Sequence, residues 1–221
     1  MGFYHGAKGS GPYFEGWYFK QQSGGDTVAF IPSMHREKNG RVYASLQVIT
    51  EEGAYSAVFP ASQFKARQDR LEVRLGRSLF SERGCELDVN AEGLVVKGRL
   101  RFGPLTPPEG DIMGPFRAAP GMECRHSVFS LCHKVDGWVE LNGKIFLFRS
   151  GTGYIEGDRG RSFPSGYLWT QCLFPGGSLM LSAARIPFFP FSFTGCIGFV
   201  FLKGRERRIA TYRGARLLHV G

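Results

Sequence analysis

The chain has 221 residues, with 28 Lys and Arg against 19 Asp and Glu, which gives a formal net charge of +9. Apolar residues make up 43% and charged residues 21% of the chain, a balance that excludes a disordered protein and a coiled coil. Its 31 glycines and 12 prolines leave few long stretches for helices, and the aromatic and β-branched residues between them predict an all-β protein.

Runs of aromatic and β-branched residues recur between turn signals along the chain. The first extended run is YFEGWYFK at 13–20. Further strands are predicted at 27–32, 41–50, 53–59, 71–75, 77–81, 85–90, 94–102, 123–135, 138–141, 144–149, 166–174, 178–186, 193–202 and 206–213. Turn pairs such as Asn39-Gly40 and Asn142-Gly143 indicate hairpins between neighbouring strands. Only 61–69 has a helical pattern, and it is weak.

Residues 103–121 separate two sets of predicted strands. Nine of these 19 residues are Gly or Pro, and such a backbone cannot join the interior of a sheet. We therefore expect an N-terminal β-barrel at 1–102, a Gly/Pro-rich linker at 103–121 and a C-terminal β-barrel at 122–221. The alternative is that 103–121 forms a long loop across the mouth of one barrel.

The positive charge is concentrated in the second half, with a net +7 for 111–221 against +2 for 1–110. Such a basic half indicates an anionic partner or, alternatively, dispersed solubilising charge. An oligonucleotide-binding barrel is disfavoured, because the basic residues do not alternate with aromatic residues along one strand.

The segment 186–202 has no charged residue and is flanked by Arg185 and Lys203. Its prolines and glycines favour a buried hairpin over a membrane span. The alternative is an exposed apolar edge, or lip, that dips into a membrane while the basic residues of 205–208 contact anionic lipid head groups. The N-terminus lacks signal-peptide features, and five cysteines without a C-x-x-C motif indicate a reducing compartment. We expect a cytoplasmic protein, peripheral at the inner membrane face if the lip is exposed.

A metal site is not expected. Cys124, His126, Cys132 and His133 lie in one predicted strand, where about 3.3 Å per residue separates positions 124 and 132 by roughly 26 Å. One zinc ion cannot bind all four side chains, and only Cys124 with His126 stays open as a pair. Nucleotide-binding loops and the G-x-S-x-G nucleophile motif do not occur in the sequence, so no cofactor is expected either.

The first candidate acid is Glu15, which shares one strand face with Trp17 and Phe19. A carboxylate beside an indole on an inward face has its charged form disfavoured by desolvation, and it could then donate a proton. The alternative is a structural ion pair between Glu15 and an arginine at a strand edge.

The second candidate region is 153–172, GYIEGDRGRSFPSGYLWTQC. It is expected to form a Gly-rich loop with Glu156, Asp158, Arg159 and Arg161, followed by a strand with three residues on one face: Tyr167, Trp169 and Gln171. Either Glu156 or Asp158 serves as an acid at a barrel mouth lined by Trp169, or the charged residues form a structural network.

These stretches, with the run at 122–143 (MECRHSVFSLCHKVDGWVELNG), resemble the tocopherol cyclase family in its bacterial branch, from residue 13 through most of the chain. The resemblance implies two consecutive lipocalin-like β-barrels, related in fold to carotenoid hydratases, and closure of a chromanol ring on a prenylated hydroquinone without cofactor or redox change. It supports four candidate catalytic residues, Glu15, His126, Glu156 and Asp158. The candidate substrate-binding residues are Trp17, Phe19, Tyr154, Arg159, Tyr167, Trp169 and Gln171.

The chain departs from the family pattern at 157–160. Where the cyclases have K-N-W-G, this sequence reads Gly-Asp-Arg-Gly, so it loses an aromatic side chain and gains an Asp158–Arg159 pair. The change favours a more polar substrate or a different reaction, such as hydration or isomerisation. A Phe-rich barrel also suits a carrier that holds a lipid, quinone or isoprenoid unchanged. Either way the expected partner is a small hydrophobic ligand.

Overall fold

The computed structural model describes residues 3–6, 9, 11–188 and 191–218. This part of the chain contains fifteen β-strands and three short 3-10 turns, and no α-helix. The all-β prediction is therefore confirmed. None of the described residues belongs to a helix that could span a membrane.

Eleven strands form one antiparallel sheet in the order β4-β3-β2-β1-β11-β10-β9-β8-β7-β6-β5. Its strands are β1 (Tyr13–Ser23), β2 (Asp26–Arg36), β3 (Val42–Thr50), β4 (Ala54–Pro60), β5 (Phe64–Ala66), β6 (Glu72–Leu75), β7 (Ser78–Ser81), β8 (Gly84–Ala91), β9 (Leu94–Phe102), β10 (Cys124–Leu141) and β11 (Lys144–Gly160). The second sheet has the order β12-β13-β14-β15, with β12 (Tyr167–Phe174), β13 (Gly177–Phe188), β14 (Phe191–Leu202) and β15 (Arg205–Ala210). The 3-10 turns are η1 (Ala61–Gln63), η2 (Gly114–Ala118) and η3 (Thr211–Arg213).

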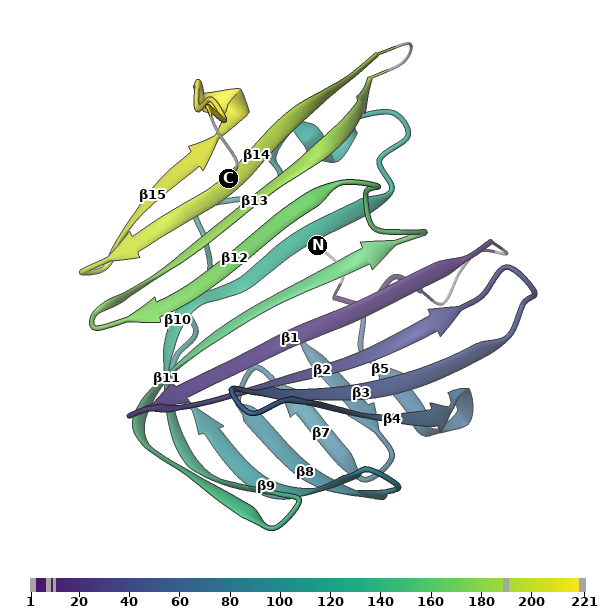
Figure 1. The fold of residues 1–221 in the computed structure, drawn as a ribbon, viewed down its shortest axis with the longest axis vertical. Helices are drawn as coiled ribbons and strands as arrows, with labels where there is room; N and C mark the ends of the chain where they lie inside the picture. Colours follow the sequence, from purple (N-terminus) through teal and green to yellow (C-terminus); the bar gives the residue numbers. More distant parts are fainter. Residues whose placement is uncertain (1–2, 7–8, 10, 189–190, 219–221) are drawn as a thin grey trace.

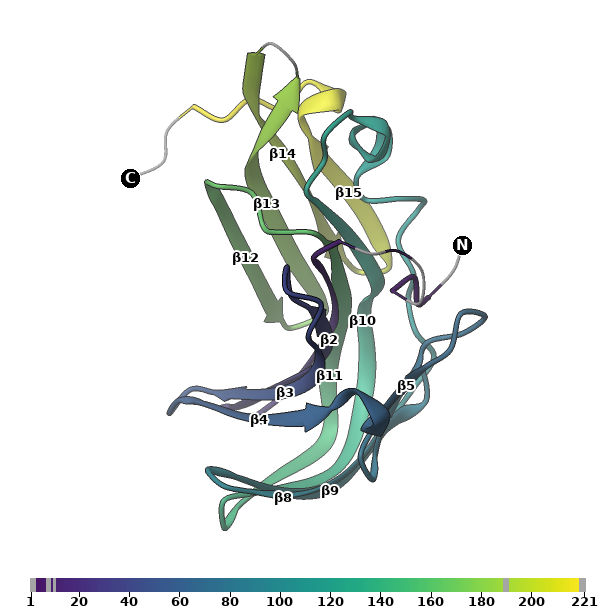
Figure 2. The same ribbon diagram turned by 90° about the vertical axis from the view of Figure 1, so that its right-hand side faces the viewer.

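The larger sheet curls around a first hydrophobic core, and the smaller sheet packs beside the upper parts of β10 and β11 (Figures 1 and 2). The first core holds side chains such as Phe30, Leu46 and Phe80, all fully buried. A second core lies between the two sheets and includes Met180 and Phe199. Among the described residues neither sheet closes on itself, because β4 and β5 end the larger sheet and are linked only through η1.

Strands β10 and β11 serve both cores. On β11, Ile155 lies in the first core and its neighbour Tyr154 lies in the second, because successive side chains of a strand point to opposite faces. The two strands are 18 and 17 residues long, so they extend past the edge of the first core. β10 pairs with β9 and β11 pairs with β1, across the division that was expected at 103–121. Strands from both sides of 103–121 therefore share the larger sheet, where two separate closed barrels were expected.

The Gly-rich stretch expected as a loop is the second half of β11. Its glycines provide room for neighbouring backbones: a Cβ at Gly160 would lie 2.0 Å from the Glu123 carbonyl oxygen, and one at Gly157 would lie 2.9 Å from that of Gly16. These residues let β1 and β10 approach β11 from its two sides. Strand β10 likewise replaces the two strands expected at 123–135 and 138–141, with three register shifts along its length.

Residues 103–121 pack along β10 and β15 and do not form a free linker. The Leu131 amide donates to the Thr106 carbonyl at 2.7 Å, and the Tyr212 hydroxyl donates to the Ile112 carbonyl at 3.0 Å. Ile112 and Met113 are buried in the second core. The weak helical pattern at 61–69 forms η1 and β5, because Phe64 packs against the first core.

The apolar segment 186–202 contributes to the β13–β14 hairpin, as predicted, but it is not buried on both faces. Phe191 is 77% exposed and Phe193 is 39% exposed. Leu202 pairs with Arg205, so the basic turn lies at the far end of the hairpin from Phe191. At about 3.3 Å per residue, the two ends are about 35 Å apart.

Candidate active site

A cavity of about 450 Å³ lies between the two sheets, on the face of β1, β2, β10 and β11 that is turned away from the first core. Strands β12, β13 and β14 and the turn η2 provide its other walls. Its lining is mostly apolar and includes Tyr18, Ile31, Met113, Phe116, Trp169 and Ile186. We call it the intersheet cavity.

Three titratable side chains meet at this cavity. His126 on β10 lies between two carboxylates of β11, with its Nδ1 2.9 Å from Asp158 Oδ1 and its Nε2 3.2 Å from Glu156 Oε2. The strand register explains this, because His126 is paired directly with Asp158 and Val128 with Glu156. His126 is 9% exposed and Glu156 is 3% exposed, so both charges are removed from bulk water.

Glu156 is held by two aromatic side chains. Its Oε2 accepts a hydrogen bond of 2.6 Å from the Tyr154 hydroxyl and one of 3.4 Å from Trp169 Nε1. The Trp169 ring meets Tyr18 edge to face, with centroids 5.5 Å apart. Burial and the nearby Glu156 charge raise the pKa of the Tyr18 phenol. The carboxylate thus has a fixed position in an aromatic surrounding.

The protonated form of His126 is favoured in this group. Burial alone would lower the pKa of His126, but the charges of Asp158 and Glu156 outweigh it and raise the pKa well above the ordinary value. Asp158 accepts the Nδ1 hydrogen bond, whereas the contact from Nε2 to Glu156 is an ion pair without hydrogen-bond alignment. An imidazolium between two carboxylates can donate a proton and recover it, which suits general acid–base chemistry.

Ligand atoms of His126, Glu156 and Asp158 all lie within 4.8 Å of one another, so this group could also hold a divalent cation. Cys124 contacts the same group, with its Sγ 3.5 Å from Asp158 Oδ1, and burial raises the pKa of its thiol. His133 lies elsewhere, with its ring against Phe102.

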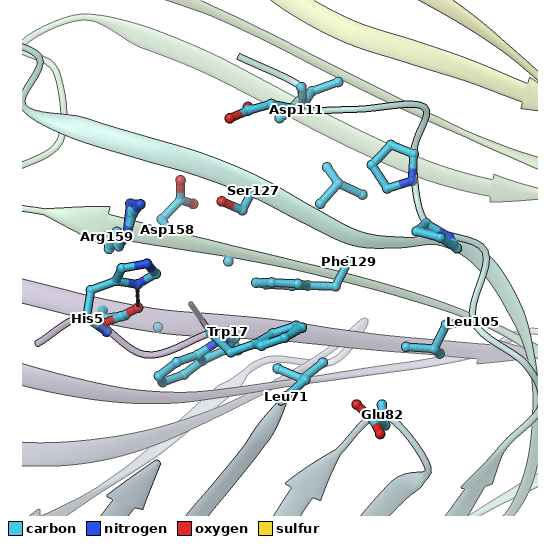
Figure 3. A pocket seen from close by; sticks show the side chains of 18 of the residues that line it. His5, Trp17, Leu71, Glu82, Leu105, Asp111, Ser127, Phe129, Asp158 and Arg159 are labelled. Carbon is cyan, nitrogen blue, oxygen red and sulfur yellow. Dashed lines mark hydrogen bonds and ion pairs between the residues drawn. The ribbon is translucent and has the colours of Figure 1, made fainter. Parts of the chain in front are cut away.

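Glu15 faces the opposite side of the sheet, toward a second cavity of about 440 Å³ that Figure 3 shows. Its Oε2 accepts hydrogen bonds from the His5 amide at 2.8 Å, the Gly6 amide at 3.0 Å and the Tyr13 hydroxyl at 2.9 Å. Its Oε1 lies 2.9 Å from His5 Nδ1, the contact drawn as a dashed line. Glu15 therefore anchors the N-terminal residues and lies apart from Glu156.

The remaining candidate residues divide between the two faces. Tyr167 lines the intersheet cavity beside Trp169, and Trp17 lines both cavities. Phe19 is buried in the first core against Phe80. Arg159 lines the second cavity, and Asp158 lines both cavities. Among the described residues the ion-pair partner of Asp158 is His126, so the expected Asp158–Arg159 pair is not formed.

Gln171 lines neither cavity. Both polar atoms of its side chain are buried, and no described residue hydrogen-bonds to them. Its backbone carbonyl accepts a hydrogen bond of 3.3 Å from Lys20 Nζ.

Sequence reasoning missed much of the lining of the intersheet cavity, including three side chains that can hydrogen-bond to a ligand: Tyr18, Ser33 and His35. Tyr18 has the opposite strand parity from Trp17, so attention to the Trp17 face excluded it. No local signal identified Ser33 and His35. A two-residue turn at Asn39-Gly40 would pair Ser33 with Leu46, whereas the hairpin has a three-residue loop, 38–40, that pairs Ser33 with Ser45.

No family model matches the chain, and no curated protein matches its sequence. Among solved structures, the chain is similar to the crystal structure of a "putative AttH" from Nitrosomonas europaea, with a TM-score of 0.52 and 15% sequence identity. The match covers 89% of this chain and 68% of that one. At this identity the similarity shows the fold.

Proposed function

We propose that the protein binds an elongated hydrophobic molecule in the intersheet cavity and catalyses a proton-transfer reaction on it. The reaction we favour is the cyclisation of a prenylated hydroquinone, with hydration or isomerisation of a related substrate as close variants. The observation that carries the proposal is the His126–Glu156 pair, buried at a mostly apolar cavity that is large enough for a small-molecule ligand.

In this cyclisation the proton on His126 Nε2 passes to the Glu156 carboxylate, which delivers it to one carbon of the prenyl double bond. The tertiary carbocation that results is trapped by the phenol oxygen, which forms the new C–O bond and releases its own proton to a carboxylate of the group. Atoms and charge balance, and no electron acceptor is needed. Trp169 and Tyr18 would stabilise the cation through their ring faces, and Asp158 would orient His126.

The fold supports this proposal in general terms. We take the curled sheet and the intersheet layer to be two open, lipocalin-like halves that share β10 and β11. The resemblance to tocopherol cyclases over 14–20, 122–143 and 153–172 adds support, because His126, Glu156 and Asp158 all lie in the second and third of these stretches. The similarity to the Nitrosomonas structure bears on the fold alone.

The test is incubation of the purified protein with prenylated hydroquinones, followed by separation of the isomeric product by mass spectrometry. The expected result is a cyclised isomer with wild-type protein and loss of at least about 100-fold in rate with Glu156→Gln. Glu15→Gln is the matched control, since Glu15 faces the other cavity. Equal rates for wild type and Glu156→Gln would contradict the assignment.

The alternative function is a carrier that holds a lipid, quinone or isoprenoid unchanged. It rests on the same apolar lining. Native mass spectrometry of the purified protein would show a co-purifying apolar ligand, and recovery of that ligand unchanged after long incubation would favour the carrier.

We propose further that the ligand enters from a membrane surface. Several large apolar side chains are exposed in β12, in β14 and just before β12, namely Phe163, Tyr167, Leu168, Phe191 and Phe193. Two of them, Phe163 and Tyr167, also line the intersheet cavity. Co-sedimentation with lipid vesicles tests this: Phe191→Ser should weaken the binding. The basic turn at 203–208 lies at the far end of the hairpin, so Arg205→Ser should have a smaller effect.

A further inference from the structure

A row of five residues crosses the larger sheet on the face of the intersheet cavity. The strand register places them side by side, in the order Ser45, Ser33, Gly16, Asp158 and His126. The middle position carries no side chain, and a Cβ there would already lie 3.1 Å from the Cβ of Ser33. Because Gly16 has no side chain, it leaves space on this face of the sheet between two polar groups. His126 and its two carboxylate partners lie on one side, and the two serines lie on the other.

The serines form a hydrogen-bonded cluster with His35. His35 Nε2 lies 3.0 Å from both hydroxyl oxygens, which are 2.9 Å apart. The imidazole is held in place by stacking on Tyr43, with ring centroids 4.8 Å apart and an angle of 18° between the planes. Ser33 is 7% exposed, and both Ser33 and His35 line the cavity.

The hydrogen bonds within this cluster do not use all of its donors and acceptors, so it can bind one more polar atom. Burial lowers the pKa of His35, so its ring is neutral near pH 7 and has two tautomers. With the proton on Nε2, the ring donates to one serine and one hydroxyl donates to the other. The remaining hydroxyl proton is free or, on Ser33, has only the Ser45 carbonyl at 3.5 Å as a partner. With the proton on Nδ1, both hydroxyl protons are used and their oxygens can accept a further hydrogen bond.

We propose that Ser33, His35 and Ser45 form a recognition site for one oxygen of the ligand, a hydroxyl or carbonyl that lies at the opposite end of the reacting group from the His126–Glu156 pair. This inference rests on the proposed function and names the chemistry of its substrate. A hydroquinone has two oxygens across one ring. The oxygen next to the prenyl chain would react, and the distant oxygen would bind the serines.

The spacing of the strands agrees with such a ligand. Ser33 and Asp158 are on strands two apart, which corresponds to about 10 Å between their Cα atoms. An aromatic ring lying over Gly16 fits between the two groups, and its edges would face polar side chains on both sides. A purely aliphatic ligand would cover the serine cluster without offering it a hydrogen-bond partner, which lowers affinity.

The experiment compares two probes by isothermal titration calorimetry under anaerobic conditions: geranyl hydroquinone, and 2-geranylphenol, which lacks the distant hydroxyl. Wild-type protein should bind the hydroquinone about tenfold more tightly, the value of one well-formed hydrogen bond. In the double variant Ser33→Ala/Ser45→Ala the ratio should fall to about one. His35→Phe keeps the stacking on Tyr43 but removes the ring nitrogens, and it should reduce the ratio as well.

The matched control is Ser182→Ala. Ser182 also lines the cavity, but from β13, and it should leave the ratio at about ten. Thermal unfolding of each variant confirms that it is folded. A wild-type ratio near one, or a tenfold ratio that persists in the double variant, would overturn the recognition site while leaving the proposed function intact. Failure of wild-type protein to bind either compound would overturn the proposed function, and the site with it.

Discussion

Glu15 and Glu156 lie on neighbouring strands of one sheet, and their side chains leave it on opposite faces. Glu15 pairs with Arg159 and Glu156 pairs with Tyr18, so the two carboxylates are set by a single register. One carboxylate is saturated by hydrogen bonds from the N-terminal residues, and the other faces the intersheet cavity. The two carboxylates should therefore respond differently to the same substitution.

Glu15→Gln should lower the stability of the protein and leave ligand binding in the intersheet cavity unchanged. The amide offers one acceptor oxygen where the carboxylate offers two, so at least one donor of His5, Gly6 or Tyr13 loses its partner. The expected loss is about 2 kcal/mol in the free energy of unfolding, measured by urea denaturation. A loss of ligand affinity without any loss of stability would count against the anchoring role.

His126→Asn should destabilise the protein by about 3 kcal/mol, because it leaves the buried Glu156 carboxylate and the partly buried Asp158 carboxylate without the cation between them. A double-mutant cycle with Glu156→Gln, measured by denaturant unfolding, tests whether the contact is responsible. Glu156→Gln should cost at least about 1 kcal/mol less in the His126→Asn background than in wild type. Strict additivity would show that the two side chains do not interact.

The sequence predicted the strands well because their ends are marked locally. Asn39-Gly40 and Asn142-Gly143 turn the chain where the structure has hairpins, and the alternation around Trp17 correctly placed Glu15 and Phe19 on one face. The β11 strand was missed because its glycines read as turn residues. Their real use, close approach to Gly16 and Glu123, depends on neighbours far along the chain.

The residues of the site were predicted only in part, because the site also depends on strands that are far apart in the chain. His126, Glu156, Asp158 and Trp169 were all candidates, but the pairing of β1 with β11 separates Glu15 from them. No local pattern reveals that pairing, because 120 residues lie between the two strands.

His133 should make the protein sensitive to acid. Burial lowers the pKa of His133 from 6.5 to about 3 in the folded protein. Between these values the unfolded chain binds a proton that the folded chain does not, so stability falls as the pH falls from about 6.5 toward 3, by up to about 1.4 kcal/mol for each pH unit.

The measurement is the free energy of unfolding of wild type and His133→Gln across this range. The variant should show a shallower fall, while the difference between the two proteins stays constant above pH 7.5. His35, whose pKa is also lowered, contributes equally to both curves. Parallel curves from pH 7 to pH 4 would refute the role of His133.

Gly160→Ala should destabilise the protein severely, by about 3 kcal/mol or more. The new Cβ would overlap the carbonyl oxygen of Glu123, which directly precedes β10 beside β11. Gly166→Ala is the matched control: nothing lies within 4 Å of a Cβ at that position. Thermal unfolding compares the two. Similar midpoints for both variants would mean that β11 tolerates a wider spacing than the structure has.

The sharing of β10 and β11 between the two cores has a consequence for how the molecule melts. Neither core can unfold while the other stays intact, because unfolding either core would disrupt β10 and β11, which the other core also needs. Heat or urea should therefore produce one transition seen alike by every spectroscopic probe. A fragment ended at residue 121 would expose the unpaired edges of β1 and β9 and should aggregate where the whole chain stays in solution.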